Sequence, residues 1–257
     1  MPACLAPPTT PRHPRAMIIL PFPDLAEGTW IERRKRFMLD VALPDGSQIT
    51  AHVPNTGAMT GLVNPGARVL LSVSDNPKRK YAHTLEAVEA DGVWVGVNTQ
   101  NPNRIAAALA RARHAPFPAE GEVRPEVRYG KAERIDLLIT PADAPPLYVE
   151  IKNVHLVERP GEASFPDCVT ARGAKHLDAL ADEVAAGNRA MMVYLIQRGD
   201  VSSFRLAREI DPAYGAAFDR AVAAGVSMVA LRCTVTPEGI GDAEAVPVLE
   251  PMGMAAA

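Results

Sequence analysis

The stretch RIDLLITPADAPPLYVEIKNV, residues 134–154, decides the fold of the second half of the chain. Two runs rich in branched apolar residues, 134–140 and 147–154, flank a proline-rich segment through which no strand can continue, so they predict a β-hairpin. With a loop at 141–145, Asp136 lies opposite Glu150, and side chains directly across an antiparallel pair share a face about 5 Å apart. Lys152 follows two residues later and points the same way as Glu150. The hairpin is therefore expected to gather an Asp, a Glu and a Lys on one face.

The alternation of apolar residues supports this register, because a slip of one residue would exchange the two faces. The opposite face is expected to be wholly apolar, and it consists of Ile135, Leu137, Ile139, Val149 and Ile151. The register therefore buries this face and leaves the charged face open to a ligand.

Two converging carboxylates suit a hard divalent cation, which takes oxygen ligands and keeps waters for substrate phosphates. Asp136 and Glu150 are thus candidate ligands for Mg2+ or Mn2+, and Glu126, on the preceding strand, is a candidate third carboxylate. Lys152 would orient an attacking water or stabilise charge on a phosphoryl oxygen. This outline is that of a metal-assisted phosphodiesterase, with Asp136, Glu150 and Lys152 as catalytic residues. The alternative is an ordinary solvated strand edge.

The elements around the hairpin predict a mixed α/β layer domain over residues 101–250, because helices and strands alternate after an opening meander. An Asn cap and an alanine-rich run begin the first helix. The expected helices are 101–114, 170–186 and 212–224, and the expected strands are 123–129, 134–140, 147–154, 190–197 and 226–235.

The first half is expected to be a β domain over residues 17–100. Short alternating runs are broken by the turn signals PDG (44–46), NPG (64–66) and DG (91–92). The expected strands are 29–42, 47–53, 67–74, 81–89 and 93–98. Five short strands favour an OB-like barrel. A β-rich unit that only supports its neighbour is the alternative.

Basic residues gather at three places and predict contacts with a DNA backbone. The first cluster, residues 33–36 on the strand 29–42, would present at most two of its charges to one surface. The second cluster is residues 78–80, and the third lies on one face of the helix at 170–186. A solvated surface is the alternative for each. The predicted DNA-binding residues are Arg33, Arg34, Lys35, Arg36, Lys78, Arg79, Lys80, Arg172, Lys175 and His176.

Composition narrows the class of protein. The 257 residues are 47% hydrophobic and 22% charged, with a net charge of -3, which excludes wholesale disorder and binding by bulk positive charge. No apolar run is long enough to span a membrane. Three cysteines form no disulfide framework, which favours the cytoplasm. Residues 1–16 and 251–257 are expected to be disordered tails.

The sequence resembles the sugar fermentation stimulation protein A (SfsA) family. The resemblance runs from about residue 29 to 248 through several blocks in the same order, namely KRF-x-LDV (35–41), PNTGAMTG (54–61), SDNPKRKYAHT (74–84), VNT (97–99), EVRYG (126–130), RIDLLI (134–139), YVEIKNV (148–154) and FPDCVTARGAKHL (165–177). Ala82 and Leu85 stand where relatives carry proline and tryptophan.

The resemblance implies DNA binding, a regulatory role in sugar (maltose) metabolism, and an OB-like domain followed by a PD-(D/E)XK nuclease-like domain. By motif, Asp136, Glu150 and Lys152 correspond to the metal-binding and catalytic signature of that superfamily. Two functions stay open: a DNA-binding protein with a Mg2+- or Mn2+-dependent nuclease site, and a non-catalytic DNA-binding regulator. An OB-like module that binds oligosaccharides is disfavoured, because only 5% of residues are aromatic.

Overall fold

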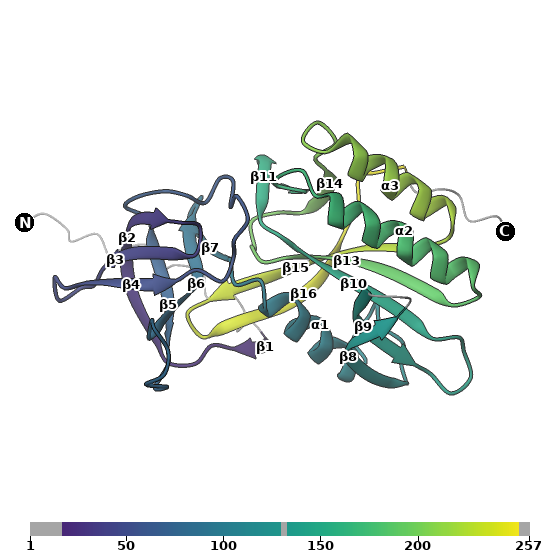
Figure 1. The fold of residues 1–257 in the computed structure, drawn as a ribbon, viewed down its shortest axis with the longest axis horizontal. Helices are drawn as coiled ribbons and strands as arrows, with labels where there is room; N and C mark the ends of the chain where they lie inside the picture. Colours follow the sequence, from purple (N-terminus) through teal and green to yellow (C-terminus); the bar gives the residue numbers. More distant parts are fainter. Residues whose placement is uncertain (1–16, 130–132, 252–257) are drawn as a thin grey trace, which may run out of the picture.

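A computed structural model describes residues 17–129 and 133–251. The tail predicted at 1–16, and all but Pro251 of the tail predicted at 251–257, lie outside these residues. Figure 1 shows a β-barrel at one end of the molecule and a layered α/β unit at the other. Among the described helices, none is long and apolar enough to cross a membrane.

Seven strands of the described chain form one mixed sheet, whose central strands are β10, β13 and β15. These three run parallel, whereas the pairs toward both edges are antiparallel. In sheet order the strands are β1 (Ile18–Pro21), β16 (Gly239–Val246), β15 (Ser227–Thr236), β13 (Arg189–Ile196), β10 (Leu147–Val154), β9 (Glu133–Thr140) and β8 (Glu122–Tyr129). A parallel centre is covered on both faces, and this one is covered by helices.

The helix α1 (Asn101–Arg111) packs on one face of the mixed sheet, and α2 (Ala171–Ala185) and α3 (Pro212–Ala223) pack on the other (Figure 1). Thr170 and Asp211 cap α2 and α3, because each side chain accepts a hydrogen bond from a backbone N–H in the first turn. The Asn cap predicted for α1 is wrong. Gln100 occupies the cap position and makes no side-chain cap bond, while the Asn101 amide reaches Glu86 instead.

The barrel is formed by six strands of the described chain, closed by a short pairing of β4 with β6 at His52 and Thr84. Its strands are β2 (Leu25–Arg34), β3 (Met38–Ala42), β4 (Gln48–His52), β5 (Arg68–Val73), β6 (His83–Ala90) and β7 (Val93–Gly96). Trp30, Leu39 and Val95 are in its core. Gly46 and Gly66 have φ of 86° and 93°, as the predicted turns require. The expected fold class, a mixed α/β protein with an N-terminal OB-like barrel and a C-terminal α/β domain, is confirmed.

The single strand expected at 29–42 is wrong, because the chain reverses at residues 35–37 to form the β2–β3 hairpin. Lys35 and Arg36 adopt φ of 51° and 64° in this turn. The reversal lets Leu39 enter the same core as Trp30. The basic cluster 33–36 therefore surrounds a hairpin turn and does not alternate along a strand.

The strand β1 also differs from expectation, because residues 18–21 join the mixed sheet rather than the barrel. The Met17 backbone and Asp242 exchange two hydrogen bonds, and Leu20 is buried in the core beneath α1. Strand β16 and a small sheet of β11 (Leu156–Arg159), β12 (Glu162–Phe165) and β14 (Ser203–Leu206) were also not expected.

Ion pairs and hydrogen bonds hold the barrel against the α/β domain. Arg198, whose side chain is 2% exposed, donates to Asp91 of the barrel at 2.8 Å and to Asp200 at 2.6 Å. The Met59 N–H donates to the Asp167 carboxylate at 3.2 Å. The barrel is thus fixed beside the hairpin that carries the predicted site.

Candidate active site

The β9–β10 hairpin has the predicted register, with Leu147 opposite Ile139 and Val149 opposite Leu137. The apolar face was only partly right. Leu137, Ile139, Val149 and Ile151 pack beneath α1, whereas Ile135 lies in the core beneath α2 and α3. The alternation of the two faces along β9 breaks at Asp136. The pairing of β9 with β10 ends there, and Glu126, which lies across from Asp136 on β8, takes a φ of 51°.

Asp136 sits at this break with both carboxylate oxygens occupied. Its Oδ2 accepts from the Ile151 N–H at 2.8 Å, and its Oδ1 accepts from the Asn103 amide of α1 at 2.8 Å. Burial, together with the nearby charge of Glu150, raises the pKa of Asp136 above its ordinary value. The negative charge of Glu150 therefore disfavours ionisation of Asp136, and both carboxylates line one cavity.

Glu150 is almost fully buried, and the side chains of Lys152 and His176 contact its carboxylate. Lys152 donates to its Oε1 at 2.7 Å, and His176 of α2 also contacts this oxygen. Burial acts to raise the pKa of Glu150, but the hydrogen bond from His176 and the charge of Lys152 outweigh it and lower this pKa. Glu150 is therefore ionised at neutral pH.

His176 joins the outer part of α2 to Glu150. Arg172, one turn earlier on α2, donates from Nε to His176 Nε2 at 3.2 Å, and His176 Nδ1 faces both Glu150 and the Lys152 ammonium. His176 and Arg172 were predicted to contact phosphate. The structure places His176 as a partner of Glu150 and leaves Arg172 exposed at the rim of the cavity that they line.

A cavity of about 430 Å³ joins these groups. It brings together six of the predicted site residues, while Lys175 is exposed and lies outside it. The predicted residues that line it are Glu126, Asp136, Glu150, Lys152, Arg172 and His176. Thr99 and Asn103 also line it and were not predicted. Asn103 gave a weak signal, because the NPNR run (101–104) reads as an ordinary helix start, and Thr99 stood only in the VNT block (97–99).

The third predicted ligand, Glu126, is turned toward another partner. Its exposed carboxylate pairs with Arg134 at 3.2 Å. Within residues 17–129 and 133–251, no group of three His, Cys, Asp or Glu side chains is placed to hold a metal ion. The geometry therefore offers two carboxylates, from Asp136 and Glu150, rather than three.

Arg33, one of the basic residues at the β2–β3 turn, is only partly exposed. Arg33 donates to the carbonyl oxygens of Arg36, Asn55, Gly57 and Ala58, and so ties the 54–59 loop to the β2–β3 turn. In that loop region, Met59 and Gly61 have positive φ.

The other basic residues of the barrel are more exposed. Arg34 pairs with Asp40 at 2.6 Å. In the second cluster, Lys78 is exposed, Arg79 donates to Thr84 at 2.9 Å, and Lys80 lies 5.4 Å from the centre of the Tyr81 ring.

The chain matches two family models. Residues 31–97 match the SfsA N-terminal OB domain, and residues 100–239 match the sugar fermentation stimulation protein RE domain. A sugar fermentation stimulation protein homolog of Brucella ovis is 52% identical over 232 residues, which cover 90% of this chain and 97% of that protein. The homolog of Brucella melitensis is 51% identical over the same length and shares.

A solved structure has the same fold, with a TM-score of 0.82 and 24% identity over 91% of this chain and 100% of the other. Its description reads "The structure of Pyrococcus Furiosus SfsA in complex with Ca2+". Because a family model covers more than half of the chain and relatives are about half identical along nearly all of it, the chain belongs to the sugar fermentation stimulation protein family.

Proposed function

We propose that this protein binds DNA and hydrolyses its phosphodiester bonds at the cavity of Asp136, Glu150 and Lys152, with Mg2+ or Mn2+ as cofactor. The observation that carries the proposal is the meeting of two carboxylates and one ammonium on paired strands in one open cavity. A strand edge with no role has no reason to bury an Asp beside a Glu, because like charges at close range destabilise the fold.

The residues present fit a divalent cation of the hard, oxygen-seeking class. Asp136 and Glu150 would hold it. Mg2+ is commonly bound by one or two carboxylates plus waters and substrate phosphates, so a third protein carboxylate is not required. A relative of the same fold was solved in complex with Ca2+, another cation of this class. When bound, the cation supplies charge neutralisation and an activated water.

The other side chains of the cavity have assignable roles. Asn103 and the Ile151 N–H fix the orientation of the Asp136 carboxylate. Lys152, whose side chain is 13% exposed, would stabilise negative charge on a phosphoryl oxygen. His176 holds Glu150 in place from α2, and Arg172 lies at the rim, where a phosphate would approach.

DNA binding is assigned to the exposed basic residues of the barrel and of α2. Lys35, Arg36, Lys78 and Lys80 are exposed, and Lys175 is exposed on α2. Groups of this kind track a phosphate backbone without reading its sequence. We assign the protein to the cytoplasm, because Cys168 and Cys233, the two cysteines in the described part of the chain, are both free.

A DNA-binding regulator without catalysis is the competing function. One observation favours it: Lys152 and His176 already occupy the same oxygen of Glu150. In that case the carboxylates serve only to shape a binding surface, since a nuclease-like frame does not by itself imply activity.

A cleavage assay separates the two functions. Purified protein is incubated with single-stranded, duplex and branched DNA in Mg2+, Mn2+ or EDTA. We expect cleavage that needs the cation and that falls about 100-fold or more in Lys152→Ala, because a group that stabilises developing charge is removed. Arg159→Ala, which removes an exposed cation outside the cavity and outside the assigned DNA-binding residues, is the matched control. Equal cleavage by wild type and Lys152→Ala, or none by wild type on any substrate, refutes the catalytic proposal.

A further inference from the structure

Three cavities adjoin one another between the barrel and the Asp136–Glu150 site. The barrel-side cavity, about 480 Å³, and the helix-side cavity, about 720 Å³, share Leu20, Gln100 and Arg104 as lining residues. The helix-side cavity in turn shares Asn103 and Asp136, among others, with the candidate active site. A continuous groove therefore runs from the barrel, along α1, to the paired carboxylates.

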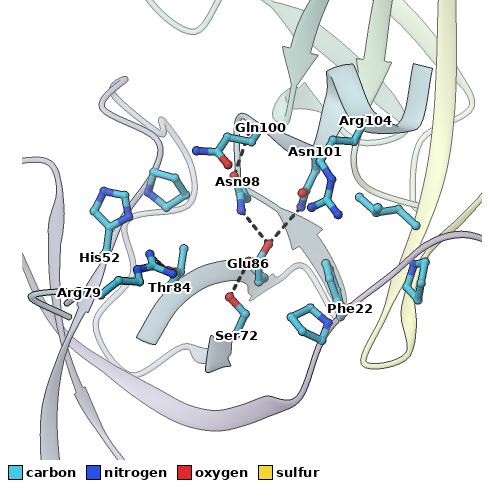
Figure 2. A pocket seen from close by; sticks show the side chains of 14 residues that line it. Phe22, His52, Ser72, Arg79, Thr84, Glu86, Asn98, Gln100, Asn101 and Arg104 are labelled. Atoms are coloured by element: carbon cyan, nitrogen blue, oxygen red, sulfur yellow. Dashed lines mark hydrogen bonds between the residues drawn. The ribbon is translucent and has the colours of Figure 1, made fainter. Parts of the chain in front are cut away.

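The barrel-side cavity carries its positive charge on two arginines that come from different domains (Figure 2). Arg79 enters from the barrel and donates to Thr84, and Arg104 enters from α1. Arg104 is exposed and has no hydrogen-bond or ion-pair partner within the described residues. Burial and the charge of Arg79 lower the pKa of His52, so this ring is neutral at pH 7. The two guanidinium groups are thus the anion-binding groups of this cavity.

The floor of the barrel-side cavity is polar, and its buried carboxylate is fully hydrogen-bonded. Glu86 is buried and accepts from Ser72 at 2.8 Å, from Asn98 at 3.0 Å and from Asn101 at 3.1 Å (Figure 2). Three donors share this carboxylate, so its charge is spread over a fixed hydrogen-bond network. Such a floor offers amide and hydroxyl groups at set positions, the kind of group that recognises the edge of a base.

One wall of the same cavity is apolar and rigid. It is formed by the segment Leu20, Pro21, Phe22 and Pro23, which leads from β1 toward the barrel. Phe22 is half-buried and is held by a bond from its N–H to the Glu238 carbonyl. A fixed aromatic ring beside prolines provides a flat face for stacking, and stacking on aromatic rings is a common way to hold an unpaired base.

We propose that the barrel-side cavity is a subsite for one unpaired nucleotide, with its base against Phe22 and its phosphates on Arg79 and Arg104. The strand continues through the helix-side cavity to Asp136 and Glu150. The inference rests on the proposed function and adds to it a substrate class: single-stranded DNA, or a duplex with an unpaired end. A base inside a cavity cannot be paired, so an intact duplex cannot occupy the subsite.

The test measures binding in EDTA, so that its outcome does not depend on cleavage. The probe is fluorescein-labelled oligothymidine of about 12 nucleotides, within the ~4–16 nucleotides that one OB fold covers. We expect wild type to bind this strand about tenfold more tightly than a blunt duplex of the same length. Phe22→Ala and Arg104→Gln should each weaken single-strand binding about tenfold, through removal of stacking and of a charged phosphate partner, and should leave duplex binding unchanged.

Two controls keep the result interpretable. Arg124→Gln removes one exposed arginine of β8 that lines none of the three cavities, and it should bind as wild type does. Arg104 is exposed, so its variant folds even where Phe22→Ala does not. A scan of single abasic positions along the oligonucleotide should find one position that weakens wild type and has no further effect on Phe22→Ala.

The outcomes separate this inference from the proposed function. Equal affinity for single strand and duplex, or unchanged single-strand binding by Arg104→Gln, overturns the subsite even if the protein cleaves DNA at Asp136. Conversely, the expected binding changes without any metal-dependent cleavage establish the subsite and refute the catalytic proposal.

Discussion

The Asp136 carboxylate accepts a hydrogen bond from the backbone N–H of Ile151 at 2.8 Å. A side chain thus occupies the acceptor position that a continuing β9–β10 ladder would give to a backbone carbonyl. The bond ends the regular pairing after Leu137 and Val149 and fixes Asp136 near Glu150. The interruption of the sheet is therefore what builds the candidate site.

Asp136→Asn should remove stabilisation of the protein by divalent cations. A ligand at ~100 times its Kd stabilises the folded state by about 2.7 kcal/mol, so Mn2+ should raise the melting temperature of wild type. The Asn variant keeps an oxygen for Ile151 but loses the charge, and its melting temperature should not respond. Thermal denaturation with and without Mn2+ measures this, with Glu126→Gln as a control that retains the response. A full Mn2+ response in Asp136→Asn would show that the cation binds elsewhere.

Arg33→Gln should destabilise the fold rather than act mainly on DNA binding. Its guanidinium donates to four backbone carbonyl oxygens, and hydrogen bonds to charged groups contribute about 1.5–3 kcal/mol. We expect a loss of about 2 kcal/mol in the free energy of unfolding, measured by urea denaturation. Arg34→Gln, which breaks one exposed ion pair with Asp40, should cost much less than Arg33→Gln, because solvent screens an exposed pair. Equal losses in the two variants would contradict the structural role of Arg33.

Neutralising four exposed cations of the barrel together should reduce the salt dependence of DNA binding. The variant replaces Lys35, Arg36, Lys78 and Lys80 by Gln, residues that line none of the three cavities. Each cation that no longer neutralises a phosphate lowers the slope of log affinity against log salt by about 0.7 for a single strand. Fluorescence anisotropy over a salt series gives the slope. An unchanged slope would remove the barrel surface from the DNA path.

Lowering the pH should protonate Asp167 and thereby weaken the contact that its carboxylate makes between the two domains. Buried His155, whose Nε2 lies 3.4 Å from the Asp167 carboxylate, is the largest cause that lowers the pKa of Asp167 below its ordinary value, and the Met59 N–H adds to it. A lowered carboxyl pKa contributes stability above the unfolded value of 3.8, and this is lost as the pH falls through the folded value. Melting temperatures from pH 7 to pH 3 should fall less steeply for Asp167→Asn than for wild type. Parallel curves would refute this coupling.

The sequence was informative where one local pattern determines the structure. The proline-rich loop at 141–145 fixes the hairpin register, and this register, together with the end of the pairing after Leu137, brings Asp136, Glu150 and Lys152 to one cavity. The bounds of α3 and β10 were expected within one residue for the same reason, since capping and turn residues mark their ends.

The predictions that were wrong or missing concern features that depend on contacts between segments far apart in the sequence. Nothing local to Ile18 or Leu20 shows that they pair with β16, more than 200 residues later. Likewise, Arg33 reads as one of four equivalent cations, and only the folded 54–59 loop shows that its donors are already used. Asn103 gained its position near Asp136 from the packing of α1, which no spacing in the sequence encodes.

The pairing of β1 with β16 makes the barrel an insertion within the larger domain, since β2 to β7 lie in the chain between the first strand of the mixed sheet and α1. During synthesis, the complete barrel leaves the ribosome early, whereas the edge position for β1 is created only when Gly239–Val246 emerges. Residues 18–21 therefore take their place in the mixed sheet only after Gly239–Val246 has been synthesised, and the Leu20–Pro23 wall of the groove is completed later than the barrel.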